Sequence, residues 1–240
     1  MPDHRPVLLL TRTQAQSERF AGRFRARFGR DWPVVISPLI AIRDLPAALP
    51  QQMPPHIVFT SENAVAAWCR RSGDRSALAW CVGARTAEAA AAAGFRTRVG
   101  PGDAAGLARL VAETVAGEAV LYPHGAETAF DMAAALAERG LRPQAVALYA
   151  QEPVPPAAAA VAVLRSGGDV LLPLFSRNAA RRAAAEFGRP SARLLIACIA
   201  PAVAEAAAPL GAARLRIAAR PDAGALLDAL ADLVAEANSA

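Results

Sequence analysis

Two segments of this chain repeat each other, and the repeat limits how the chain can fold. Residues 81–94 read CVGARTAEAAAAAG and residues 198–211 read CIAPAVAEAAAPLG, so the two align without a gap. The match continues beyond the alanines, because each copy is followed by a short basic strand, RTRV or RLRI, and then by a helix that opens with aspartate. Turns, strands and helices that keep the same order predict two related α/β units.

The two copies end differently, and this difference predicts how the chain is threaded. The first copy continues into a strand and a helix at residues 119–140, whereas the second ends with its helix at residues 226–237. A segment with the pattern of the missing unit, VLLLTRTQAQSERF, stands near the start of the chain. We therefore expect the chain to begin one lobe, build the whole of a second lobe, and return to complete the first.

This threading leads to a predicted fold class and to predicted boundaries. Short apolar runs alternate with helical segments, which is typical of α/β proteins with parallel sheets. We predict two Rossmann-like lobes with parallel sheets, joined by a two-stranded hinge that favours relative motion of the lobes. The first lobe is expected to comprise residues 1–36 and 155–240, the second lobe residues 45–146, and the two connections residues 37–44 and 147–154.

A strand that runs into small polar residues at a helix start occurs once in each predicted lobe. The two segments are HIVFTSENAV, residues 56–65, and DVLLPLFSRNAA, residues 169–180. Turns of this kind present backbone N–H groups to a ligand, so we expect two ligand-binding edges that face a shared cleft. The polar residues at these helix starts are Thr60, Ser61, Asn63, Ser176, Arg177 and Asn178.

The second copy of the repeat departs from the first at the turn. In the first copy, Gly83 is expected to permit a tight turn and Thr86 to cap the helix that follows. The second copy has Ala200 and Val203 at the corresponding places. Pro173 has no backbone N–H to donate, so the strand that contains it is expected to be short or to lie at a sheet edge.

The charge of the chain narrows the class of its ligands. The net charge is +5, the isoelectric point is near 10.0, and all 26 basic side chains are arginines. Because arginine binds carboxylates and phosphates through two parallel hydrogen bonds, an anionic partner is predicted. The sequence contains no long basic run, zinc-finger spacing or aromatic stacking motif, which argues against nucleic-acid binding. The arginine pairs at 70–71 and 181–182 are expected to be solvated helix faces.

The cysteines indicate the cellular compartment. Cys69, Cys81 and Cys198 are odd in number and far apart, so neither structural disulfides nor a metal site is expected. The pattern fits a reducing cytoplasm. The first apolar run is too short for a signal peptide, and no apolar segment is long enough to span a membrane, so we expect a cytoplasmic protein without membrane association.

Several of these motifs, taken in order, resemble the uroporphyrinogen-III synthase family. The resemblance covers most of the chain. It rests on the order of the motifs and on the threading of the repeat, because no single motif is decisive. The motifs are TRT at 11–13, FTSENAV at 59–65, VGARTAEA at 82–89, the pair Leu148-Tyr149, and FSRNAA at 175–180.

The resemblance implies an activity. Enzymes of this family cyclise the linear tetrapyrrole hydroxymethylbilane to uroporphyrinogen III, with loss of water and inversion of the last pyrrole ring. The family uses neither a metal nor an organic cofactor, and its fold is two Rossmann-like lobes with the active site in the cleft. The implied partner is therefore a small-molecule polycarboxylate, and the protein is expected to be a monomer.

The resemblance also implies roles for individual residues. Tyr149 matches the tyrosine that the family places near the return connection, where its hydroxyl could donate a proton to the departing hydroxyl. The alternative is a ring that packs in the hinge. The residues expected to bind substrate are Arg12, Thr60, Ser61, Asn63, Gly83, Thr86, Ser176, Arg177 and Asn178. Helix capping is the alternative role for the hydroxyl and amide residues, and a salt bridge is the alternative for Arg12.

A second function remains open at the level of sequence. The chain could be a non-catalytic, two-lobed protein that binds tetrapyrroles or other anions and serves in regulation. The replacements at Ala200 and Val203 favour this alternative, because they remove a glycine turn and a hydroxyl from the second ligand-binding edge. The presence of Tyr149 and of the FTSENAV segment favours the enzyme.

Overall fold

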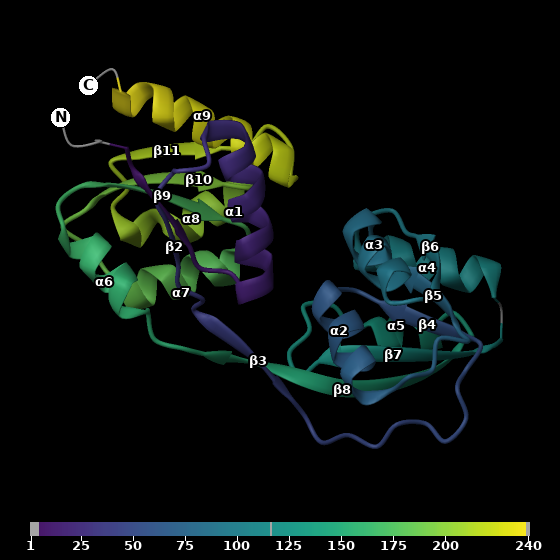
Figure 1. The fold of residues 1–240 in the computed structure, drawn as a ribbon. Coiled ribbons are helices and arrows are strands. Elements are labelled where there is room, and N and C mark those ends of the chain that lie inside the picture. Colours follow the sequence, from purple (N-terminus) through teal and green to yellow (C-terminus); the bar gives the residue numbers. More distant parts are fainter. Residues whose placement is uncertain (1–4, 116, 239–240) are drawn as a thin grey trace. The chain divides into compact units, whose positions relative to one another are not determined.

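A computed structural model describes residues 5–115 and 117–238 of the chain (Figure 1). The chain forms two compact units. Unit 1 runs up to Ala41 and resumes at Pro153, and unit 2 comprises Ile42–Glu152. The chain passes from one unit to the other twice, within the strands β3 (Ile40–Asp44) and β8 (Arg142–Pro153).

Unit 1 contains a five-stranded parallel sheet in the order β11-β10-β9-β1-β2. Its central strands are short apolar runs that are buried on both faces, as is usual for parallel sheets covered by helices. The strands are β1 (Val7–Leu10), β2 (Val34–Ile36), β9 (Asp169–Leu174), β10 (Arg193–Cys198) and β11 (Arg214–Ile217).

Helices cover both faces of this sheet. They are α1 (Gln14–Phe28), α6 (Ala158–Arg165), α7 (Arg177–Phe187), α8 (Pro201–Ala207) with the short 3-10 turn Ala208–Leu210, and α9 (Ala223–Asn238). In α1, Phe20 and Phe24 are four residues apart and share the buried face. The helix ends at Gly29, whose positive φ of 123° favours glycine.

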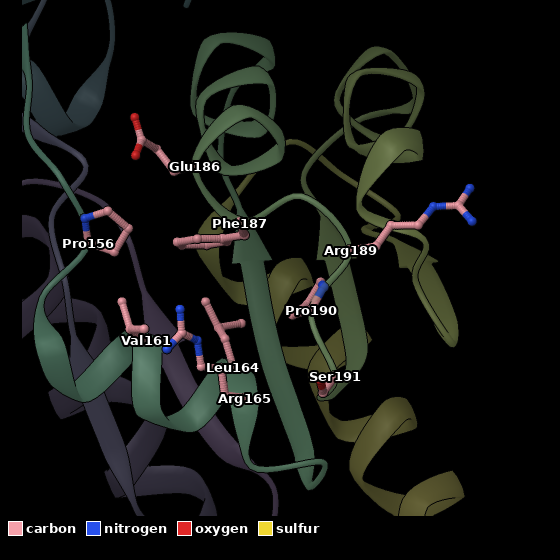
Figure 2. Close-up of a pocket in the computed structure, with 9 residues that line it drawn as sticks. All are labelled: Pro156, Val161, Leu164, Arg165, Glu186, Phe187, Arg189, Pro190 and Ser191. Carbon is pink, nitrogen blue, oxygen red and sulfur yellow. The ribbon is translucent and has the colours of Figure 1, made fainter.

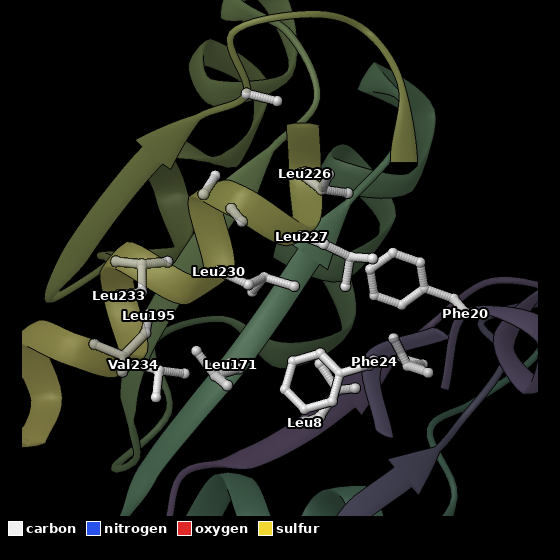
Figure 3. Packing of buried hydrophobic residues seen from close by; sticks show 14 of the residues in the cluster. Leu8, Phe20, Phe24, Leu171, Leu195, Leu226, Leu227, Leu230, Leu233 and Val234 are labelled. Atoms are coloured by element: carbon white, nitrogen blue, oxygen red, sulfur yellow. The ribbon is translucent and has the colours of Figure 1, made fainter. Parts of the chain in front are cut away.

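Alternation along the strands divides the apolar side chains of unit 1 between two cores. Leu8 and Leu10 of β1 point to the core under α1 and α9, whereas Leu9 points to the core under α6, α7 and α8. Figure 3 shows the first core, in which Phe20 lies beside Leu227 of α9 and Phe24 lies beside Leu8 of β1. Burying each such leucine or phenylalanine contributes about 1.5–3 kcal/mol, so these contacts hold the start of the chain against its end.

Unit 2 contains a six-stranded sheet in the order β3-β8-β7-β4-β5-β6, and the pairings from β8 through to β6 are all parallel. Its remaining strands are β4 (His56–Phe59), β5 (Leu78–Cys81), β6 (Arg96–Val99) and β7 (Ala119–Gly125). Its helices are α2 (Glu62–Arg71), α3 (Ala84–Ala92), α4 (Ala104–Thr114) and α5 (Met132–Ala137).

The two sheets have corresponding strand orders, as the repeat predicts. Read from one edge, the order β11-β10-β9-β1-β2 in unit 1 corresponds to β6-β5-β4-β7-β8 in unit 2. Strand β1, from the start of the chain, therefore takes the place that β7 takes in unit 2. The predicted α/β class with two mostly parallel sheets is confirmed. That the connections 37–44 and 147–154 act as a hinge between the predicted lobes stays a prediction.

The prediction for the strand that contains Pro173 is wrong. This strand, β9, lies between β10 and β1 and pairs with β10 along its full length. The carbonyl of Leu174 accepts a hydrogen bond from Ile199 next to β10, so the preceding residue, Pro173, faces the β1 side. Pairing of β9 with β1 stops at Leu171. The backbone N–H that Pro173 lacks is therefore not needed for any hydrogen bond between the strands.

The predictions for the turn of the repeat are also wrong. Gly83 has φ −163° and ψ 177°, an extended conformation that any residue adopts, and Ala200 has nearly the same angles, φ −159° and ψ 160°. The replacement of glycine by alanine therefore costs no backbone strain. Thr86 does not cap its helix, because the N-cap position belongs to Gly83, and Thr86 lies buried three residues further on.

The arginine pairs at the end of α2 and in the middle of α7 are not merely solvated. Arg70 donates two hydrogen bonds to the carboxylate of Asp44, and Arg71 donates to the carbonyls of Leu45 and Ala47. These contacts hold the end of β3 against α2. In unit 1, Arg182 donates to the carbonyl of Leu39, just before β3. Sequence reasoning missed these contacts because they join residues far apart in the chain.

Candidate active site

The carboxyl edge of the sheet in unit 2 gathers polar side chains from three neighbouring strands. Strand β4 ends at Phe59 and is followed by Thr60 and Ser61, and β7 ends at Gly125. Tyr149 of β8 lies opposite Gly125 in the pairing of β7 with β8. Because neighbouring parallel strands end at the same edge, residues far apart in the sequence meet there, at the place where α/β proteins bind ligands.

Ser61 connects this edge to the start of α2. The extended backbone at Ser61 makes it the N-cap residue, and its Oγ accepts a hydrogen bond of 3.1 Å from the N–H of Ala64. The same Oγ lies 3.0 Å from the hydroxyl oxygen of Tyr149. Capping was the alternative role considered for Ser61, and the structure combines it with a contact to the predicted catalytic residue.

Tyr149 is buried, and only 6% of its surface is exposed. Its ring lies directly against Gly125, where an added Cβ would stand 2.9 Å from Cε2 and 3.0 Å from Cζ of the ring. Burial raises the pKa of the Tyr149 hydroxyl above its ordinary value, and the hydrogen bond with Ser61 partly offsets this rise. The hydroxyl is therefore protonated at neutral pH and can serve as a donor.

Tyr122 forms a parallel arrangement that the sequence did not reveal. It is one of only two tyrosines in the chain, it is buried, and Thr60, next to Ser61 in the chain, is the side chain that lowers the pKa of its hydroxyl. Burial raises the pKa of Tyr122, and the charges of Tyr149 and Asp131 act in the same direction. The rarity of tyrosine was the signal that could have drawn attention to this residue.

His124 follows Tyr122 by two residues on β7 and supports the strand end near Tyr149. Its ring stacks on Tyr122, with ring centroids 4.9 Å apart. Its Nδ1 is 2.7 Å from the carbonyl oxygen of Gly125, which can only accept, so Nδ1 carries a proton. His124 thus fixes the end of β7, on which the ring of Tyr149 rests.

The other predicted site residues of unit 2 lie at the starts of α2 and α3. Asn63 is half-buried in the first turn of α2, Gly83 is half-buried at the N-cap of α3, and Thr86 is 5% exposed. An ion pair of 2.8 Å between Glu62 and Arg85 joins these two helix starts. Backbone N–H groups of both helices therefore point to the edge that carries Tyr149.

The remaining predicted site residues belong to unit 1, at the carboxyl edge of its own sheet. Arg12 follows β1, and its guanidinium lies 4.2 Å from the ring centre of Phe175 in a cation–π contact. Ser176 caps α7 by accepting from the N–H of Ala179 at 3.2 Å. Arg177 and Asn178 follow it and are exposed. The structure brings these four together in unit 1, and the other six in unit 2.

A cavity of about 400 Å³ lies elsewhere in unit 1, between α6 and the end of α7 (Figure 2). Val161, Leu164 and Phe187 give it apolar walls, and its lining also includes Arg165 and Arg189, whose side chain points away from the other residues. None of the predicted site residues lines this cavity. The cavity belongs to unit 1, whereas Tyr149 belongs to unit 2.

Two further observations concern the chemistry available to the chain. Within the described residues, no group of three or more His, Cys, Asp or Glu side chains could hold a metal ion. Burial raises the pKa of the thiol of Cys81 to about 12 and that of Cys198 to about 11, so neither thiol is a nucleophile at neutral pH.

Across residues 5–115 and 117–238, none of the helices has both the length and the apolar character needed to cross a membrane.

Comparison with known proteins identifies the family. A family model described as uroporphyrinogen-III synthase HemD matches residues 19–228. Among solved structures, the uroporphyrinogen-III synthetase of Helicobacter pylori superposes with a TM-score of 0.69 at 15% identity, covering 95% of this chain and 99% of that one. A mutant uroporphyrinogen III synthase from the extremely thermophilic bacterium Thermus thermophilus gives 0.55 at 15% identity, covering 96% and 99%.

A search of curated proteins gave no match. The two solved structures share the fold of this chain, at an identity too low to carry more than the fold. The family model, by contrast, spans most of the sequence and includes both the FTSENAV segment and Tyr149. On this match, the chain belongs to the uroporphyrinogen-III synthase family.

Proposed function

We propose that this protein is a cofactor-free uroporphyrinogen-III synthase in which Tyr149 donates the proton that releases water. The reaction cyclises hydroxymethylbilane to uroporphyrinogen III, with inversion of the last pyrrole ring, in tetrapyrrole biosynthesis. The observation that carries the proposal is the family match over residues 19–228. The buried Tyr149 beside Ser61 supplies the donor that the reaction needs.

The role of Tyr149 follows from the first step of the reaction. The terminal hydroxyl of the substrate leaves with its electron pair, and a proton delivered to that oxygen makes it water. Because the pKa of Tyr149 is raised, its hydroxyl keeps its proton at neutral pH and can deliver it to the departing oxygen. The remaining methylene carbon is positively polarised and reacts with an electron-rich pyrrole.

The rest of the task is conformational. In solution, the linear tetrapyrrole closes without inverting its last ring, so the enzyme must hold the chain in the geometry that leads to inversion. Positioning of this kind can lower a barrier by about 7–11 kcal/mol without further acid–base groups. We propose that the substituted carbon of the last ring attacks while the substrate is held, forming a spiro intermediate.

Substrate carboxylates are the groups by which the protein holds the chain. In unit 2, the side chains of Thr60, Asn63 and Thr86 and the backbone at Gly83 lie at two helix starts, which favour anions. The proposed contribution of unit 1 consists of Arg12, Ser176, Arg177 and Asn178. The net charge of +5 supports binding of a polyanion.

The cellular setting belongs to the same proposal. The protein acts in the cytoplasm as a monomer, and its lobes, residues 1–36 with 155–240 and residues 45–146, close on the substrate. The cysteines are free and lie far apart in the chain, which supports a reducing cytoplasm. The proposed chemistry requires no partner, which supports a monomer. Ala200, which favoured a non-catalytic protein at the level of sequence, no longer does so, because its backbone adopts the conformation of Gly83.

A product-isomer assay tests the proposal. Purified protein is mixed with freshly prepared hydroxymethylbilane, and the oxidised products are separated into isomers I and III. We expect isomer III to form in proportion to protein concentration. If isomer I alone forms, at the rate seen without protein, the chain is not a synthase.

A further inference from the structure

We infer that Ser61 is a positioning residue that acts through Tyr149, by donating a hydrogen bond to its hydroxyl oxygen. This inference rests on the proposed function and assigns Ser61 a task different from the substrate contact expected from the sequence. The motivating observation is the distance of 3.0 Å between Ser61 Oγ and the hydroxyl oxygen of Tyr149, two residues 88 positions apart in the chain.

The direction of this hydrogen bond is part of the inference, because either hydroxyl could be the donor. A serine hydroxyl has one proton and two acceptor lone pairs. One lone pair of Ser61 Oγ is occupied by the N–H of Ala64, so the serine proton is available for Tyr149. When Ser61 donates, the proton of Tyr149 is free to point to the substrate. The resulting chain runs from the Ala64 N–H through Ser61 to Tyr149.

Charge on the Tyr149 oxygen gives a further reason for this role of Ser61. Tyr149 is buried, so the negative charge that grows on its oxygen as the proton leaves is poorly solvated. The hydrogen bond from Ser61 stabilises that charge, and accordingly it lowers the pKa of Tyr149 against the effect of burial. The N–H of Ala64, at the positive end of α2, polarises the Ser61 hydroxyl and makes it a better donor.

The position of the Tyr149 side chain is also fixed by its neighbours. Contact with Gly125 limits where the ring of Tyr149 can lie, and Ser61 fixes the position of its hydroxyl. Ser61 itself is fixed as the N-cap of α2. Tyr149 is thus held at both the ring and the oxygen by residues that need not touch the substrate.

The proton balance of the step is complete without another reagent. Tyr149 gives its proton to the departing hydroxyl, the carbon–oxygen bond breaks with its electron pair on oxygen, and water leaves. The phenolate that remains is held by the hydroxyl of Ser61. In the spiro intermediate, the bond from the substituted carbon of the last ring to its original methylene bridge breaks and re-forms at the free carbon of that ring, which inverts the ring. That carbon then loses its proton to recover the aromatic system, and Tyr149 takes this proton back.

Three substitutions separate the two tasks of Ser61. Ser61→Thr keeps both the cap and the donor and should keep kcat within a few-fold. Ser61→Asp keeps the cap but cannot donate at neutral pH, and its carboxylate would accept the proton that Tyr149 needs to deliver. Ser61→Ala loses both. We expect kcat to fall about tenfold or more for Asp and Ala, with KM nearly unchanged.

Asp103→Ala is the matched control for loss of a cap. Asp103 caps α4 in the same unit by accepting from the N–H of Gly106 at 2.7 Å, and it is not among the proposed site residues. This variant should lose thermal stability while kcat stays at the level of the unaltered protein. A Ser61→Asp variant as active as the unaltered protein would overturn the inference. So would a raised KM with unchanged kcat, which would make Ser61 a substrate contact.

Combination with Tyr149→Phe tests whether Ser61 acts through Tyr149. If it does, Ser61→Ala has no further effect on kcat in the Tyr149→Phe protein, because the hydroxyl on which it acts is already gone. A full additional loss of kcat would show that Ser61 acts independently, and would contradict the inference.

A spectroscopic test keeps this inference separate from the proposed function. In a Tyr122→Phe protein labelled at tyrosine Cζ with carbon-13, the single remaining resonance belongs to Tyr149. Replacing Ser61 with Ala removes a hydrogen bond that lowers the pKa of Tyr149, so the ionisation of Tyr149 should move to higher pH and its Cζ resonance should shift at neutral pH. An unchanged resonance contradicts the inference even if the protein is an active synthase. A shifted resonance in a protein without synthase activity shows that only the proposed function has failed.

Discussion

Thr60 and Ser61, which are consecutive in the chain, each interact with one of its two tyrosines. The side chain of Thr60 lowers the pKa of Tyr122 on β7, and Ser61 contacts Tyr149 on β8, so the end of β4 serves both its neighbour β7 and the strand beyond it. The sequence, read with its family resemblance, predicted Tyr149 and the polar strand end. It could not predict the pairing, because this depends on the order β8-β7-β4 in the sheet and not on separation along the chain.

The contact between Gly125 and Tyr149 leads to a prediction at the scale of one residue. In Gly125→Ala, the new methyl group would stand about 3 Å from the ring of Tyr149, closer than carbon atoms pack, so the ring must move. A displacement near 1 Å at a catalytic group can cost about 10²-fold in rate. We expect kcat for isomer III to fall about 10- to 100-fold while the protein stays folded.

Gly73→Ala is the control for this substitution. Gly73 lies in the same unit, has ordinary φ, and has nothing within 4 Å of the position of an added Cβ. It should leave kcat unchanged. Equal kcat values for the two glycine variants would mean that the position of the Tyr149 ring does not matter for turnover.

At the scale of helices and strands, apolar periodicity and turn residues predicted where most elements lie, and interactions across the sheet determined the rest. Considered with its own strand alone, Pro173 predicted an edge strand. Strand β9 can nevertheless be central, because Pro173 faces β1, and pairing with β1 has already stopped at Leu171. Arg70 and Arg71 looked like a solvated face because their partners, Asp44 and the carbonyl of Leu45, come from a different segment.

Helix α1 offers a stability prediction. Gly22 lies in the middle of this helix, on its exposed side, with nothing within 4 Å of an added Cβ. Glycine costs about 0.5–1 kcal/mol relative to alanine in a helix interior, because it loses more backbone entropy on folding. Gly22→Ala should therefore raise the free energy of unfolding by about that amount in a denaturant titration. A lower value would mean that the glycine serves a contact.

The ion pair between β3 and α2 predicts a pH dependence. The hydrogen bonds from Arg70 are the largest cause that holds the pKa of Asp44 below its ordinary value. A carboxyl whose pKa is lower in the folded state stabilises the protein above its unfolded pKa of about 3.9, and this contribution disappears as pH falls through the folded pKa. The pair is partly exposed, with 38% of the Asp44 side chain accessible, so the contribution is at most about 1 kcal/mol.

Asp44→Asn provides the measurement. The variant should unfold at lower denaturant concentration than the unaltered protein at pH 7, and the difference should shrink as the pH is lowered below about 4. A difference that stays constant over this range would show that charge on Asp44 does not contribute.

At the scale of the whole molecule, the repeat was the most informative part of the sequence. It predicted that the first strand belongs with the last ones, and β1 indeed pairs with β9 in the sheet that also contains β10 and β11. Individual hydrogen bonds between side chains were beyond this reasoning, since they require coordinates for residues from different elements.

The two units can be followed separately through their cysteines. Cys81 ends β5 in unit 2 and Cys198 ends β10 in unit 1, and both are fully buried. Burial raises the pKa of these thiols to about 12 and about 11, so neither is exposed or ionised in the folded protein. We expect a maleimide at pH 7 to modify Cys69, which is partly exposed, and to spare the other two.

Mass spectrometry of tryptic peptides reads this labelling at each cysteine. As denaturant is added, Cys81 should become reactive when unit 2 unfolds and Cys198 when unit 1 unfolds. Rapid modification of Cys81 or Cys198 without denaturant would contradict the burial of the ends of β5 and β10.

The most direct test of the account compares Tyr149→Phe with the unaltered protein in the rate at which hydroxymethylbilane becomes isomer III. Removal of one hydroxyl leaves the ring in place and takes away the proton donor, so the rate should fall by about 10²-fold or more while circular dichroism stays the same. If Tyr149→Phe forms isomer III as fast as the unaltered protein, then the hydroxyl of Tyr149 does not release the water.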